Sequence, residues 1–106
     1  QIIKEFKKEV EINGGIFVVV HLPPKTHLQH YINSGAFKYE DILEQLEDLT
    51  NLIRPETKLE KHAYSNTIDS LYGDHYSPIG HEIIGEHISY YLYNNLKINH
   101  IDGSVD

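Results

Sequence analysis

The run Ile16-Phe17-Val18-Val19-Val20-His21-Leu22 is the most strand-like part of this chain, and the expected fold depends on it. It is rich in β-branched and aromatic residues and has apolar side chains on both faces, as central strands of parallel sheets do. Asn13-Gly14-Gly15 precedes the run and Pro23-Pro24 ends it. We therefore predict a buried parallel strand here, followed by a loop at its carboxyl end.

Segments with apolar residues at helical spacing lie on both sides of this run. We expect helices over 1–12, 26–32, 39–49 and 57–61, and a brief second strand over 51–54. This order predicts an α/β fold, namely a partial flavodoxin-like αβα sandwich with parallel strands. We expect residues 1–98 to form a single α/β domain or the C-terminal part of a larger one, and 99–106 to form a loose tail.

The composition argues against several classes of function. A net charge of −7 over 106 residues, with no basic stripe, argues against a nucleic-acid partner. The longest apolar run is far shorter than the roughly 20 residues of a membrane-spanning helix, so no membrane span is expected. The chain has no Cys, which excludes disulfides and thiolate metal sites.

A second informative stretch is Tyr72-Gly73-Asp74-His75-Tyr76-Ser77-Pro78-Ile79-Gly80-His81. Ser77 suits the N-cap of a helix and Pro78 suits its first position, where no N–H is required. The residues that follow, as far as Leu92, place apolar side chains on one stripe. His75 is therefore expected on a loop just ahead of the N-terminus of an amphipathic helix.

This second stretch resembles the last sequence block of the SGNH (GDSL-type) hydrolases, in which a His and a Pro-containing turn precede a Gly-His pair that opens the final helix. The strand that ends at Pro23 is also similar to a long strand of that family, and the resemblance extends from Gln1 to about Leu96. It implies the C-terminal portion of an SGNH-hydrolase-like fold. It also implies an esterase that acts on an O-acyl ester of a lipid or carbohydrate, with His75 as general base.

The chain departs from the family pattern at two places. The Gly-Asp-Ser block of the nucleophile and the Gly and Asn of the oxyanion hole are not found, so the resemblance implies a Ser supplied by a missing N-terminal half or a partner chain. The family's orienting Asp lies two or three residues before the His, where this chain has Gly73 and Tyr72. Asp74 is the nearest carboxylate and can orient His75 only if the backbone turns at Gly73. Otherwise, Asp69 or a main-chain carbonyl must do so.

Three alternatives stay open on sequence alone. The chain could belong to the O-acyltransferases that share the His block, or it could be a non-catalytic α/β binding or interaction module. In the third alternative, His75 is an ordinary loop residue ahead of a capped helix. A sheet of two recognisable strands leaves edges uncovered, so the segment alone is expected to be marginally stable.

The remaining histidines do not predict a metal or cofactor site. His81 and His87 lie six residues apart, which places them on different helix faces, whereas zinc sites on helices favour spacings of three or four. His27 and His30 share a face, but no third ligand is evident nearby. His21 ends the buried strand and could line a pocket, although a hydrogen bond to the backbone is the favoured interpretation.

Overall fold

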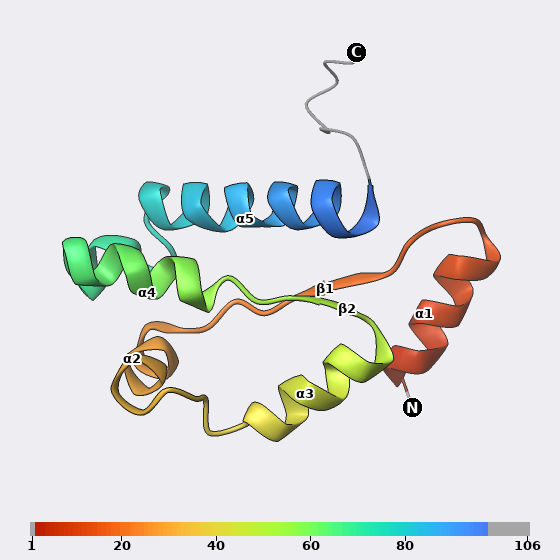
Figure 1. Cartoon of the computed structure of the whole chain (residues 1–106), viewed down its shortest axis with the longest axis horizontal. Helices are drawn as coiled ribbons and strands as arrows, with labels where there is room; N and C mark the ends of the chain where they lie inside the picture. Colours follow the sequence, from red (N-terminus) through yellow and green to blue (C-terminus); the bar gives the residue numbers. More distant parts are fainter. Residues whose placement is uncertain (1, 98–106) are drawn as a thin grey trace, which may run out of the picture.

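The computed structural model describes residues 2–97, which form five α-helices, one short 3₁₀ helix and two short strands. Figure 1 shows the two strands at the centre, with α5 on one side of them and α2 and α3 on the other. The elements in chain order are α1 (Ile2–Ile12), β1 (Val18–Val20), α2 (Lys25–Ser34), α3 (Glu40–Leu49), β2 (Asn51–Ile53), α4 (Glu56–Ser65), the 3₁₀ helix η1 (Ile68–Leu71) and α5 (Pro78–Leu96).

The predicted αβα sandwich is wrong. Residues 2–97 are 67% helical and contain a single sheet of two parallel strands, so this part of the chain is a small, mostly helical domain rather than a flavodoxin-like sandwich or a portion of one. The expected strand over 16–22 shortens to Val18–Val20, and Ile16 is 51% exposed. With one neighbouring strand and incomplete helical cover, the β-branched run has too few partners to continue as a strand or to be buried on both faces.

The sheet itself has the expected parallel direction. Val18 pairs with Asn51, Val19 with Leu52 and Val20 with Ile53, and Ile53 is fully buried. The side-chain amide of Asn51 also donates to the carbonyl of Phe17, at 3.0 Å, just ahead of β1. Because each strand has one partner, both outer edges of the sheet are unpaired within residues 2–97.

Several helices agree with their sequence-based expectations. α1 and α3 begin and end within a residue of the expected bounds, whereas α2 and α4 are longer than expected. α4 extends to Ser65 because Leu59 is fully buried on its inner face and Ala63 packs beside it. The predicted tail, 99–106, lies outside the described residues.

Two apolar clusters form the core. In the first, α2, α4, η1 and α5 meet around four buried side chains: Leu28, Leu59, Leu71 and Ile84. In the second, α3 and β2 meet beneath the loop that joins α2 to α3, around three buried side chains: Phe37, Leu43 and Leu52. Large apolar side chains on α1 stay exposed, including Phe6 at 55%. Within residues 2–97, the helices lack the combination of length and apolar character that a membrane crossing requires.

Close approach between η1 and α5 fixes the turn that carries His75. Ser77 caps α5 as expected, because its hydroxyl accepts from the N–H of Gly80 at 3.2 Å and donates to the carbonyl of Ser70 at 2.6 Å. Gly80 lies directly against the carbonyl of Leu71, where a side chain would collide with the backbone. The start of α5 is therefore held against the end of η1.

Candidate functional site

His75 lies at the tip of a tight turn between η1 and α5. Tyr72 and Tyr76 form an antiparallel bridge, and the N–H of Gly73 donates to the carbonyl of His75 at 3.3 Å. The exposed His75 side chain lines a cleft of about 450 Å³ together with Leu22 and other residues at the carboxyl end of β1. His75 therefore lies on a loop just ahead of α5, as expected from the sequence.

Two phenols attach this turn to the end of β1. The hydroxyls of Tyr72 and Tyr76 both donate to the carbonyl of Pro23, at 2.9 and 2.5 Å, and their rings stack with centroids 4.9 Å apart. Burial raises the pKa of both Tyr72 and Tyr76 above its ordinary value, so both hydroxyls keep their protons at neutral pH. These two hydrogen bonds therefore hold one side of the cleft beside His75 in a fixed position.

The structure places Asp74 and His75 on the same cleft without joining them. No hydrogen bond reaches either ring nitrogen of His75 within residues 2–97, from Asp74 or from any carbonyl. Asp69, the second candidate, forms an ion pair with Lys25 instead. The catalytic role of His75 and the orienting role of Asp74 therefore stay predictions.

A polar cluster that the sequence-based reasoning missed lies at the carboxyl ends of both strands. The hydroxyl of Tyr39 lies between two imidazoles, 2.9 Å from Nε2 of His21 and 3.0 Å from Nδ1 of His27. Phe37 stacks on Tyr39, with ring centroids 5.4 Å apart, and makes an edge contact with His21 at 4.7 Å. The phenol is thus held in place by aromatic packing.

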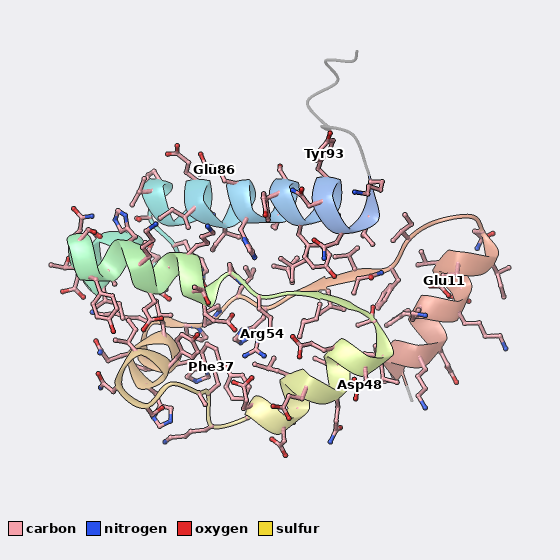
Figure 2. All side chains as sticks on the ribbon, in the orientation of Figure 1. Glu11, Phe37, Asp48, Arg54, Glu86 and Tyr93 are labelled. Carbon is pink, nitrogen blue, oxygen red and sulfur yellow. The ribbon has the colours of Figure 1, made fainter. Side chains whose placement is uncertain are left out.

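Charged residues lie behind this cluster. Nε of Arg54 is 2.6 Å from Oε2 of Glu56, and its Nη1 is 2.6 Å from Oε2 of Glu40. Figure 2 shows Arg54 between β2 and α3, whereas Glu86 and Tyr93 point outward from α5. The hydrogen bond from Arg54 lowers the pKa of Glu40.

Glu56 is the one charged residue buried in the described part of the chain, with 4% of its surface exposed. Its Oε1 is 3.7 Å from Nδ1 of His21, an ion-pair distance too long for a hydrogen bond, and neither atom has a hydrogen-bond partner in the described part of the chain. Burial works to raise the pKa of Glu56, but the proximity of His21 and the charge of Arg54 outweigh it and hold that pKa below its ordinary value. Glu56 is therefore an ionised carboxylate beside an imidazole.

A sequence pattern could have indicated this cluster. His21 follows β1, while Arg54 and Glu56 follow β2, and carboxyl ends of parallel strands meet at one edge of a sheet. Tyr39 lies immediately before α3 and follows neither strand, so this pattern could not have indicated it. Its position depends on the stacked rings around it.

The other histidines are also placed by the structure. His81 is exposed and lines the same cleft as His75. His87 is half-buried on α5 with Nδ1 unpaired, and burial, assisted by the charge of Lys58, lowers the pKa of His87. No group of three His, Asp or Glu side chains in residues 2–97 converges as a metal site would require. Comparisons with protein-family models, with curated proteins and with solved structures found no match to this chain.

Proposed function

We propose that this chain supplies the general base, His75, of an SGNH-type serine esterase that acts on the O-acyl ester of a lipid or carbohydrate. The observation that carries the proposal is the exposed imidazole of His75 at a cleft of about 450 Å³, on a turn fixed by Pro23 and by the capped start of α5. The proposal depends on the resemblance of the His block and on this placement, and the sandwich fold has no part in it.

The cleft offers the environments that ester cleavage needs. A neutral imidazole takes the proton of a serine hydroxyl as that hydroxyl attacks the ester carbonyl, and then returns it to the leaving alcohol. Leu22 and Pro24 give the cleft apolar surface against which an acyl chain could pack, while the exposed side chains of Asp74 and His81 give it polar groups. Within residues 2–97, neither ring nitrogen of His75 has a hydrogen-bond partner, so the unprotonated nitrogen of the neutral ring can accept the serine proton.

None of the described residues that line the cleft is a serine, so the proposal requires a nucleophile supplied from elsewhere. Ser77, the serine closest in sequence to His75, is fully used as the cap of α5. The unpaired edges of the sheet are suitable positions for a further strand that would bring the nucleophile. Those same edges also favour a second candidate function, a non-catalytic interaction module that pairs with a partner strand.

One experiment separates these functions. The protein, together with the sequence or partner that accompanies it in the cell, is assayed for hydrolysis of a short-chain nitrophenyl ester and for labelling of a serine by a fluorophosphonate probe. We expect His75→Ala to lower the hydrolysis rate by about 10²–10⁴-fold. His30→Ala is the matched control, because His30 lies on α2, outside this cleft, and is expected to keep the wild-type rate. Equal rates for His75→Ala and wild type, or no hydrolysis by the wild type, would contradict the esterase proposal and favour the interaction module.

A further inference from the structure

The cluster around Tyr39 constrains the protons of two imidazoles. Its hydroxyl is within hydrogen-bond distance of Nε2 of His21 and of Nδ1 of His27. A phenol has one proton to donate, so one imidazole accepts that proton and the other donates its own N–H to the phenol oxygen. Burial, with the nearby carboxylates of Glu56 and Glu40, raises the pKa of Tyr39, so the hydroxyl keeps its proton at neutral pH.

The buried carboxylate decides the direction of the chain of hydrogen bonds. The Glu56 carboxylate pairs with Arg54 through Oε2, whereas its Oε1 has no hydrogen-bond partner within residues 2–97 and lies 3.7 Å from Nδ1 of His21, where its negative charge favours a proton on that nitrogen. A neutral His21 then presents the lone pair of Nε2 to the hydroxyl of Tyr39. The phenol oxygen is left to accept from Nδ1 of His27, so His27 carries its proton on Nδ1 and has a lone pair on Nε2.

His27 lies at the first turn of α2 and lines a separate pocket of about 520 Å³. The pocket wall contains hydrogen-bond donors and no carboxylate, although the whole chain carries a net charge of −7. Phe37 is the one apolar residue among those that line the pocket, and the polar ones are Thr26, His27, His30, Asn33, Lys38 and Tyr39. The ammonium of Lys38 and the neighbouring amide and hydroxyl suit an anionic group, whereas the lone pair of His27 suits a hydroxyl donor.

We propose that this pocket binds a small anion that also carries a hydroxyl group, such as a polyol phosphate or a 2-hydroxy carboxylate. The anionic group contacts Lys38, and the hydroxyl donates to Nε2 of His27. Glu56, through His21 and Tyr39, acts as a positioning residue that sets the tautomer of His27. This site is distinct from the cleft at His75, and it does not depend on the esterase proposal.

The tautomer is tested first and without a ligand. Long-range ¹⁵N–¹H NMR of the imidazoles distinguishes a ring protonated on Nδ1 from one protonated on Nε2. We expect His27 to carry its proton on Nδ1 in the wild type, and Tyr39→Phe to return it to Nε2, the form that free histidine favours. The ring of His30, on the same helix, makes no hydrogen bond with any of residues 2–97, so His30 is the internal control and should not change. An Nε2-protonated His27 in the wild type would overturn the inference.

Binding is tested with glycerol 3-phosphate and with its two component groups as separate probes. Glycerol 3-phosphate has both groups, inorganic phosphate lacks the carbon-bound hydroxyls, and glycerol lacks the charge. We expect glycerol 3-phosphate to bind most tightly, and Lys38→Gln and Tyr39→Phe each to weaken it about tenfold, the equivalent of one charged or buried hydrogen bond. Lys97→Gln, which removes a lysine outside the pocket, should leave binding unchanged. Equal affinity for all three probes, no binding, or equal weakening by Lys38→Gln and Lys97→Gln would refute the proposed ligand class.

Discussion

Gly80→Ala should destabilise this protein, whereas the same substitution at Gly85, five residues along the same helix, should stabilise it. A Cβ atom on Gly80 would collide with the carbonyl oxygen of Leu71 and lie 3.2 Å from Cδ1 of Tyr76. A Cβ atom on Gly85 would meet nothing within 4 Å. The two variants therefore change the helix propensity of α5 in the same way and differ in whether space exists for one methyl group.

The expected size follows from these two environments. Forcing a methyl group into a packed site costs about 1–3 kcal/mol, and here the main obstacle is backbone, which cannot rotate away. Exchange of Gly for Ala in a helix recovers at most about 1 kcal/mol. We expect the free energy of unfolding to fall by about 2 kcal/mol for Gly80→Ala and to rise by about 0.5–1 kcal/mol for Gly85→Ala.

Urea unfolding followed by far-ultraviolet circular dichroism measures both values under identical conditions. The unfolding midpoint should move to lower urea for Gly80→Ala and to higher urea for Gly85→Ala, with unchanged slopes. Equal midpoints for the two variants would show that α5 does not approach η1 as described. The placement of His75 would then lose its support as well, because the same contact holds its turn.

Two further measurements test the packing around α5. Ser77→Ala should lower the free energy of unfolding by about 1–2 kcal/mol, because it removes the hydrogen bonds of the Ser77 hydroxyl with the N–H of Gly80 and with the carbonyl of Ser70. Ser89→Ala within the same helix should change the free energy of unfolding by less than about 0.5 kcal/mol. Equal effects of the two substitutions would contradict the capping role of Ser77. The free energy of unfolding should also fall as pH decreases below 6.5, the ordinary pKa of His, because the folded chain lowers the pKa of His87 and the unfolded chain therefore binds the proton first. His87→Gln should flatten this dependence between pH 7 and pH 5, and an unchanged slope would show that His87 is not responsible.

The sequence was most informative where local rules decide the structure. The cap at Ser77, the helix that follows it and the helix over 39–49 depend on spacing and on hydrogen bonds within a few residues, and the structure contains all three. The position of His75 on a loop ahead of α5 followed from its place relative to that cap, whereas the cleft beside it depends on the distant end of β1. These features need no knowledge of distant parts of the chain.

The predicted fold class is wrong because the fold class depends on which distant segments of the chain pair with each strand. The β-branched run at Val18–Val20 has the composition of a central strand, but a central strand needs neighbours on both edges, and within residues 2–97 it has one. The cluster around Tyr39 was missed for a similar reason. His21, Tyr39 and Glu56 come from three separate elements, and their contacts exist only after β1 and β2 pair.

The stacked tyrosines beside His75 have a practical consequence for spectroscopy. The chain has no Trp, so its near-ultraviolet circular dichroism comes largely from ordered tyrosines. Tyr72 and Tyr76 are fixed by a shared acceptor and by each other, and such immobilised rings lose their near-ultraviolet signal when tertiary packing is lost while helices persist. The protein therefore contains an intrinsic optical reporter next to its candidate catalytic residue, which can be followed without any added label.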